Sequence, residues 1–240
     1  MGASYHQKNI KGKISSATSI RNEILHNLNS PKTDHFTLSN KIKSTIPPSG
    51  FSVLERELRE GRGPITLNSY RQYILATLRR MSLDDISRIH GVTEGLENRI
   101  KKASLKSYTV EQLINSIKTR RYTRTKIQRI ILHLMMNLTK EDVTVFNKYG
   151  PLYARVLGLS KKGKTLLRAI KKSSSTPLIS KLSNYIRQTI SEGNSNIQSS
   201  LIKMLEYDIL ATDIYVLGNK KGENRVARLD FTHKIVMKED

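Results

Sequence analysis

Three residues near the amino terminus have the types and spacing of a phosphate-binding motif. Ser16 and Thr18 lie in a Ser- and Thr-rich stretch where a helix is expected to begin, and Arg21 follows about one turn later. The first turn of a helix presents backbone N–H groups without partners, and hydroxyl and guanidinium groups add donors for an anion. An ordinary helix N-cap has the same residue types. The spacing therefore indicates a phosphate site or a simple helix start.

A second candidate phosphate site lies between Gly158 and Thr165, where the sequence satisfies the pattern G-x-x-x-x-G-K-[ST] between a strand-like and a helix-like segment. The residues after Thr165 include no apolar strand that ends in Asp to hold magnesium, and too few strands for a doubly wound parallel sheet. A Lys-rich segment matches this pattern easily by chance. A P-loop NTPase is therefore the least favoured alternative.

The remaining reactive side chains do not form a recognisable catalytic or metal site. The chain has six His residues at scattered positions and no Cys, so zinc and thiol chemistry are not expected. Asp208 and Asp213 lie in an expected helix, where a separation of five residues points two side chains about 140° apart. We predict no catalytic residue and no metal ligand.

The positive charge is concentrated in one part of the chain. The whole sequence has 42 Lys and Arg against 20 Asp and Glu, a net charge of +22. Residues 99–191 alone contain 21 basic against three acidic residues, a net charge of +18. Such a segment is typical of a surface that binds a polyanion, above all nucleic acid, although a basic solvated face is the alternative. Tyr122 lies among these cations and is a candidate for stacking on an unpaired base. The residues expected to bind nucleic acid are Arg99, Lys101, Lys102, Lys118, Arg120, Arg121, Tyr122, Arg124, Lys126, Arg129, Lys161 and Lys162.

Hydrophobic periodicity predicts a mainly helical chain. Expected helices cover residues 15–29, 51–60, 67–81, 123–138 and 200–217, with N-caps or capping pairs at Thr37, Ser82, Thr109 and Ser160. Short strands are expected at residues 152–157, 177–180 and 228–232. No apolar run reaches the about 18 residues of a membrane span, and the absence of Cys suits a reducing compartment. We expect a cytoplasmic protein that does not bind membranes.

The segment from Ile14 to Arg21 resembles the S-x-T-x-[IV]-R signature of the HxGH-type nucleotidyltransferase superfamily, with Ser16, Thr18 and Arg21 in the signature positions. Four further segments look together like the tRNA(Met) cytidine acetate ligase family: residues 2–6, 93–100, 117–129 and 208–215. The resemblance implies an ATP-dependent ligase that forms acetyl-adenylate from acetate and ATP, with magnesium. It would then acetylate N4 of the wobble cytidine of elongator tRNA(Met). Ser16, Thr18 and Arg21 would contact the ATP phosphates.

The chain departs from the family pattern at one point, because no H-x-G-H motif occurs in the 240 residues. In the family this motif precedes the segment that matches residues 2–6. We therefore expect the chain to be the carboxyl-terminal, tRNA-binding portion of such an enzyme and to be inactive by itself. The alternative is an RNA- or DNA-binding module without catalytic activity.

The expected organisation has three parts: residues 1–30 as a remnant of the nucleotidyltransferase domain, residues 31–150 as a basic helical tRNA-binding domain, and residues 151–240 as a small α/β piece. If the rest of the nucleotidyltransferase domain is absent, we expect an exposed apolar surface around Ile14, Ile20 and Ile24 at the first helix. Oligomerisation through that surface is a further expectation.

Overall fold

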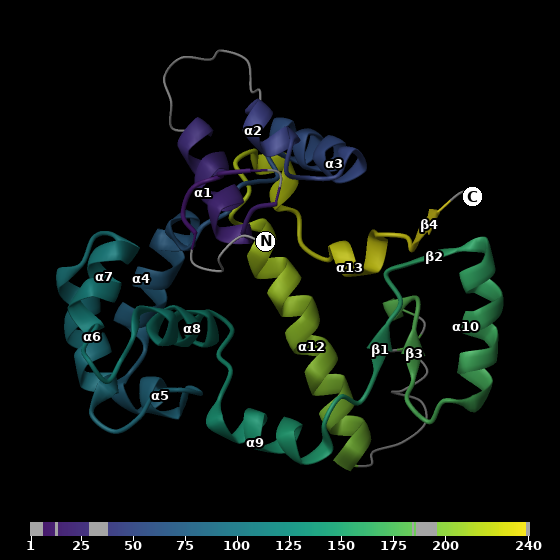
Figure 1. The fold of residues 1–240 in the computed structure, drawn as a ribbon. Coiled ribbons are helices and arrows are strands. Elements are labelled where there is room, and N and C mark those ends of the chain that lie inside the picture. Colours follow the sequence, from purple (N-terminus) through teal and green to yellow (C-terminus); the bar gives the residue numbers. More distant parts are fainter. Residues whose placement is uncertain (1–6, 13, 29–37, 184, 186–195, 239–240) are drawn as a thin grey trace. The chain divides into compact units, whose positions relative to one another are not determined.

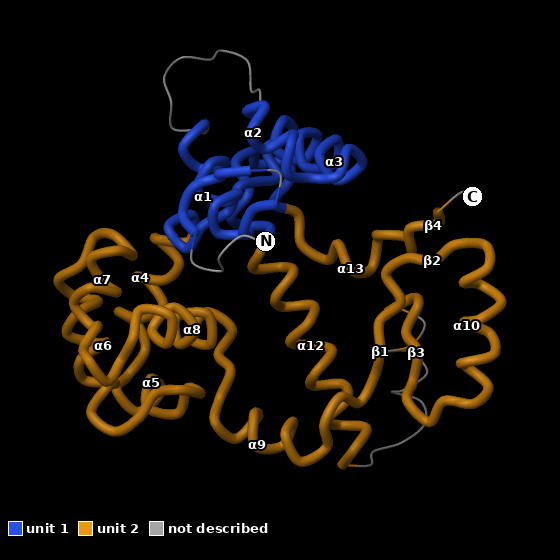
Figure 2. The backbone as a smooth tube through the Cα atoms, in the orientation of Figure 1, with its two compact units in different colours: residues 1–69, 216–225 blue, residues 70–215, 226–240 orange. Residues whose placement is uncertain are grey.

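The computed structural model describes residues 7–12, 14–28, 38–183, 185 and 196–238. The described part is mainly helical, as predicted (Figure 1). Each of its strands has only two or three residues. The chain divides into two compact units, residues 1–69 with 216–225, and residues 70–215 with 226–240 (Figure 2). The expected domain boundaries at residues 30 and 150 remain predictions.

The described part of the first unit contains three helices and two 3₁₀ segments. Its elements are α1 (Ala17–Leu28), α2 (Asn40–Lys43), α3 (Pro48–Arg59), the start of the 3₁₀ turn η1 (Leu67–Tyr70) and the 3₁₀ turn η2 (Gly222–Arg225). Helix α3 begins at Pro48, because proline already has the backbone φ of a first helical residue and no N–H is needed there. The expected cap at Thr37 lies outside the described residues.

The hydrophobic core of this unit corrects the expectation of a bare apolar surface on α1. Ile24 is only 7% exposed and packs with four buried side chains, Leu38, Ile42, Phe51 and Leu58. Ile20 is partly buried against the same cluster, whereas Ile14 is 70% exposed. Two of the three isoleucines therefore already pack against partners within the unit and offer little apolar surface for oligomerisation.

The second unit begins with a bundle of five helices, α4 (Arg71–Arg80), α5 (Leu83–Arg88), α6 (Leu96–Lys106), α7 (Val110–Ile117) and α8 (Arg124–Met135). Helix α6 contacts α4, α5 and α7, and α8 contacts α4 and α7. The apolar stripes of these helices meet in a core that includes Ile74, Leu78, Ile100, Leu113 and Ile127, each at most 2% exposed. Burial of these stripes supplies the main driving force for the bundle.

Local capping determines where several of these helices start, as predicted for Ser82 and Thr109. Ser82 and Asp85 form a reciprocal capping box at α5. Thr109 accepts a hydrogen bond from the backbone N–H of Gln112 at α7, and Thr123 accepts one from Lys126 at α8. Each hydroxyl satisfies a backbone N–H that would otherwise have no partner.

The described residues in the rest of the second unit form helices and two small parallel sheets. Its elements are α9 (Lys140–Tyr149), β1 (Ala154–Arg155), β2 (Gly158–Ser160), α10 (Lys161–Ser173), β3 (Leu178–Ile179), the long helix α12 (Asn196–Val216), α13 (Leu229–Thr232) and β4 (Val236–Lys238). Strand β1 pairs with β3, with Ala154 opposite Leu178, and β2 pairs with β4, with Gly158 opposite Val236.

The strand predicted over residues 228–232 is wrong, because that segment is the short helix α13. Arg228 has a backbone φ of +68°, and its N–H donates to Asp213 Oδ1 at 2.6 Å. A left-handed backbone at this residue is incompatible with an extended strand. The final strand of the described residues instead begins at Val236.

Candidate nucleic-acid interface

The basic surface predicted from the charge distribution is built by α6, α7, α8 and the segment that joins α7 to α8. Lys102, Lys118, Arg120, Arg121 and Arg129 are all exposed. None of these five cations has a carboxylate partner among the described residues. Like charges held together without counterions repel each other, so this surface is suited to an external polyanion.

Arg124 differs from its neighbours because it forms an ion pair. Its two terminal nitrogens lie 2.6 Å from the two carboxylate oxygens of Glu111. This bidentate hydrogen bonding lowers the pKa of Glu111. Both side chains are exposed, so the pair adds little stability, but it gives the guanidinium a defined orientation.

Two of the predicted nucleic-acid ligands have a structural role. Lys101 Nζ donates to three backbone carbonyls, those of Leu78, Arg79 and Met81, at 2.6–3.1 Å. Arg99 donates to the carbonyls of Ser116 and Lys118 at 3.1 and 3.3 Å. These carbonyls lie at the ends of α4 and α7, where a cation also interacts favourably with the helix dipole. The ammonium of Lys101 has no hydrogen left for a phosphate, so we remove it from the proposed nucleic-acid surface.

The prediction that Tyr122 stacks on a base is contradicted by its burial. The residue is only 8% exposed, and its hydroxyl lies 2.6 Å from Thr93 Oγ1. Lys126 and Arg121 lie over the ring, at 4.9 and 5.6 Å from its centroid. Tyr122 therefore connects two of the motif-bearing segments and supports two cations. Sequence alone could not detect this, because the partner Thr93 is far away along the chain.

Lys161 and Lys162 begin α10, which packs on β2 rather than within the bundle. Both are exposed, and no side chain of α10 is buried. The helix carries further exposed cations on the same element, Lys164, Arg168, Lys171 and Lys172. It is a second basic element of the chain, distinct from the bundle.

The phosphate-loop pattern within α10 does not form a phosphate loop. Residues 158–160 are extended in β2, and the helix begins at once with Lys161. The hydroxyl of Ser160 already accepts the N–H of Gly163 at 3.1 Å. No loop is left to surround a phosphate, which removes the structural basis for a P-loop NTPase.

The predicted ATP-binding residues lie at the start of α1, and their side chains differ in availability. Ser16 Oγ donates to the Gln7 carbonyl at 2.8 Å and accepts the N–H of Ser19 at 3.1 Å, so Ser16 is the helix N-cap. Thr18 and Arg21 are exposed, and neither side chain has a hydrogen bond or ion pair among the described residues. The first turn of α1 contains no acidic residue. This helix start can therefore accept an anion.

Metal chemistry has no ligand set in the described part of the chain. No group of three or more His, Asp or Glu side chains is close enough there to hold a metal ion. Asp208 and Asp213 have separate partners: Asp208 accepts the Tyr153 hydroxyl at 2.8 Å, and Asp213 accepts the N–H of Arg228. Both carboxylates therefore take part in structural hydrogen bonds.

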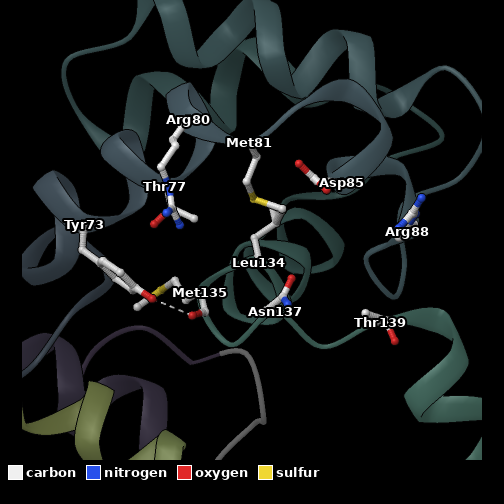
Figure 3. Close-up of a pocket in the computed structure, with 10 residues that line it drawn as sticks. All are labelled: Tyr73, Thr77, Arg80, Met81, Asp85, Arg88, Leu134, Met135, Asn137 and Thr139. Atoms are coloured by element: carbon white, nitrogen blue, oxygen red, sulfur yellow. Dashed lines mark hydrogen bonds between the residues drawn. The ribbon is translucent and has the colours of Figure 1, made fainter.

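A cleft of about 550 Å³ lies among α4, α5 and the end of α8 (Figure 3). None of the sequence motifs marks this cleft. One signal was available, because Tyr73, Thr77 and Arg80 are spaced at i, i+4 and i+7 and therefore share one face of α4. The remaining lining residues come from segments far away along the chain, namely Met81, Asp85, Arg88, Leu134, Met135, Asn137 and Thr139.

Comparison with known proteins shows the family. The model of the family described as HIGH Nucleotidyl Transferase matches residues 1–229. The chain belongs to the HIGH nucleotidyl transferase family. It is 39% identical, over 97% of its length, to the tRNA(Met) cytidine acetate ligase of Acetivibrio thermocellus, and covers 53% of that protein. It is 35% identical, over 98% of its length, to the tRNA(Met) cytidine acetate ligase of Fervidobacterium nodosum, and covers 55% of that protein.

Solved structures show the same similarity. The crystal structure of Thermotoga maritima TmcAL in its apo form I matches with a TM-score of 0.88 and 27% identity, over 99% of this chain and 54% of that chain. The form II structure of the same protein, bound with alpha-thio ATP, matches with a TM-score of 0.83 over 94% of this chain and 52% of that chain. The sequence resemblance to the acetate ligases is thus confirmed. The chain spans about half the length of the relatives it matches.

None of the helices in the described part of the chain has the length and apolar content of a membrane span.

Proposed function

We propose that this chain is the tRNA-binding portion of an ATP-dependent tRNA(Met) cytidine acetate ligase. Such an enzyme forms acetyl-adenylate from acetate and ATP and transfers the acetyl group to N4 of the wobble cytidine of elongator tRNA(Met). The proposal is supported by the 39% identity to a tRNA(Met) cytidine acetate ligase over 97% of the chain. In the proposed division, residues 31–150 contain the main tRNA-binding surface, followed by a small α/β piece.

The proposed tRNA-binding residues are the exposed cations of the bundle and the start of α10. Lys102, Lys118, Arg120, Arg121 and Arg129 are exposed without a carboxylate partner among the described residues. Further positive charge comes from Arg124, Lys126, Lys161 and Lys162. Arg99 also contributes its positive charge, although its guanidinium already donates to backbone carbonyls. Lysine and arginine side chains that are exposed on one folded domain can neutralise several phosphates of a folded RNA at once.

The proposed ATP contacts are Thr18, Arg21 and the free N–H groups of α1, with Ser16 holding the helix start in place. A solved relative, Thermotoga maritima TmcAL, has been crystallised with an ATP analogue, and this chain aligns with 52% of it. Magnesium accompanies ATP in the proposal. Since no metal-ligand cluster exists among the described residues, we assign it no ligand from this chain.

The test measures binding of an elongator tRNA(Met) transcript by fluorescence anisotropy at several salt concentrations. We expect log Kd to change with log salt by about 0.7–0.9 for every phosphate that is neutralised. Reversing charge at Lys118, Arg120 and Arg121 should weaken binding at least about tenfold and reduce that slope. The matched control reverses three exposed lysines elsewhere, Lys41, Lys220 and Lys238. Equal losses in both triple variants would show that only net charge matters, and the assigned surface would be wrong.

A further inference from the structure

The cleft beside α4 has features of a binding site that the basic surface does not share. Helix α4 contributes Tyr73, Thr77 and Arg80, and α5 contributes Arg88, while Leu134 and Met135 of α8 form an apolar part of the wall (Figure 3). The cavity of about 550 Å³ is large enough for a nucleotide. It lies within the second unit alone.

Cationic side chains outnumber carboxylates among the residues that line the cleft. Arg80 is exposed and has no hydrogen bond or ion pair with any described residue. Arg88 pairs only with Asp84 at 2.7 Å, and both side chains are about 70% exposed, so the pair is weak. Asp85 lines the same cleft, but its carboxylate accepts the N–H and hydroxyl of Ser82 at 3.0 and 2.7 Å. Arg80 therefore has no carboxylate of the described residues within hydrogen-bond distance, and Arg88 can exchange its exposed pair with Asp84 for a phosphate.

The aromatic ring in the cleft is held in place but not buried. Tyr73 is 37% exposed, and its hydroxyl donates to the Met135 carbonyl at 2.8 Å, the bond that is dashed in Figure 3. This bond fixes the ring without covering its face. An unpaired base can stack on such a ring, which is not possible on the buried Tyr122.

Polar groups without internal partners complete the lining. The side chains of Thr77 and Asn137 have no hydrogen bond to any described residue. Asn137 has a backbone φ of +51°, a left-handed conformation that asparagine adopts more readily than most residues, and it follows directly on the end of α8. A hydroxyl and an amide at these positions can hydrogen-bond the edge of a base.

The geometry points to a site for one unpaired nucleotide of an RNA, with its base on the ring of Tyr73 and its phosphate on Arg80, while Arg88 on the opposite side of the cleft contacts a neighbouring phosphate (Figure 3). Thr77 and Asn137 would contact the base edge. This inference rests on the proposed function, since it names a place where the bound tRNA is read. Two guanidinium groups match one or two phosphodiesters, whereas a nucleoside triphosphate would call for more cations than this lining contains.

The experiment compares two RNA probes by fluorescence anisotropy with the full chain: a hairpin with a seven-nucleotide unpaired loop, and the same stem as a fully paired duplex. The double variant Arg80→Ala and Arg88→Ala should weaken hairpin binding about tenfold and duplex binding less than about threefold. Tyr73→Leu should also weaken hairpin binding selectively, and Tyr73→Phe should retain it, because the ring remains. The control Arg71→Ala removes an exposed cation of α4 outside the cleft and should affect both probes equally and weakly.

The possible outcomes separate this inference from the proposed function. If hairpin and duplex lose affinity equally in the cleft variants while tRNA still binds the wild type, the cleft is not a nucleotide site and the inference is overturned. CMP or AMP could protect Arg80 from chemical modification while the cleft variants bind RNA as well as the wild type. The cleft would then bind a free nucleotide, and the inference would again fail. If the wild type binds no RNA, both the inference and the proposed function are wrong. Photo-crosslinking of a 4-thiouridine loop to Tyr73 would support the inference directly.

Discussion

Arg79 on α4 and Lys101 on α6 cap the carboxyl ends of each other's helices. Arg79 donates to the carbonyls of Ser104 and Ser107 at 3.1 and 3.0 Å, near the end of α6. Lys101 donates to carbonyls at the end of α4, including that of Arg79 itself at 2.7 Å. Two cations of a strongly basic chain thus satisfy carbonyls that would otherwise have no partner, and both interact favourably with a helix dipole.

These capping bonds predict different roles for Lys101 and its neighbour Lys102. Lys101→Met keeps the aliphatic stem but removes the donor, so we expect it to lower the free energy of unfolding by about 1–2 kcal/mol without a selective loss of tRNA affinity. Lys102→Met, at an exposed neighbour, should change stability by less than about 0.5 kcal/mol and weaken tRNA binding. Urea denaturation and anisotropy measure the two quantities. If Lys101→Met instead weakened tRNA binding and left the stability unchanged, Lys101 would belong to the tRNA-binding surface.

The buried hydroxyl of Tyr122 gives a second prediction. Tyr122→Phe leaves Thr93 Oγ1 without its 2.6 Å partner, and should cost about 0.5–1.5 kcal/mol of stability while tRNA affinity stays unchanged. Tyr108→Phe is the matched control, since that residue is 70% exposed. Thermal denaturation followed by circular dichroism gives the comparison. A loss of tRNA affinity in Tyr122→Phe without a loss of stability would contradict the structural role.

The buried carboxylate of Asp142 predicts sensitivity to acid. Burial alone would raise its pKa, but hydrogen bonds from Lys203, Tyr207 and Thr139 outweigh burial and lower the pKa from its usual 3.8 to about 2. Because the folded state holds the proton less tightly, the contribution to stability is complete above pH 3.8 and is lost as the pH falls toward 2. The contribution of Asp142 to the free energy of unfolding is on the order of 2 kcal/mol.

Asp142→Asn tests this linkage. We expect the variant to be less stable at neutral pH and to lose less stability than the wild type between pH 4 and pH 2. Asp84→Asn is the control, because the Asp84 side chain is 70% exposed. Identical pH profiles of wild type and Asp142→Asn in urea denaturation would show that Asp142 is not responsible.

The geometry of the helix start predicts different effects of Ser16 and Arg21, two residues of the proposed ATP site. Arg21→Ala removes an exposed cation, so it should weaken binding of a fluorescent ATP analogue about tenfold and leave stability nearly unchanged. Ser16→Ala removes the N-cap and should lower stability by about 1 kcal/mol. Lys41→Ala is the control for a loss of charge elsewhere in the same unit. If Arg21→Ala and Lys41→Ala bind the analogue equally well, Arg21 does not contact ATP.

Many of the helix starts were predictable from the sequence because capping is local. Ser82, Thr109, Thr123 and Ser160 each accept an N–H only three residues away. The apolar stripe of α8 and the charge excess of residues 99–191 are equally visible in the sequence, and so are the family motifs. The helix at residues 229–232 was missed because the left-handed backbone at Arg228 depends on Asp213, which lies in another element.

The sequence by itself therefore determined the helical class, the family and the location of the positive charge. Only the tertiary structure decided which cations are available to a ligand. Lys101 and Lys102 are identical in chemistry and adjacent in sequence, yet one is held by carbonyls 20–23 residues away and the other is exposed. Tyr122 is buried and Tyr73 partly exposed for the same reason. Whether a polar or aromatic group is free depends on the segments packed against it, and packing partners are set by the fold rather than by neighbours in the sequence.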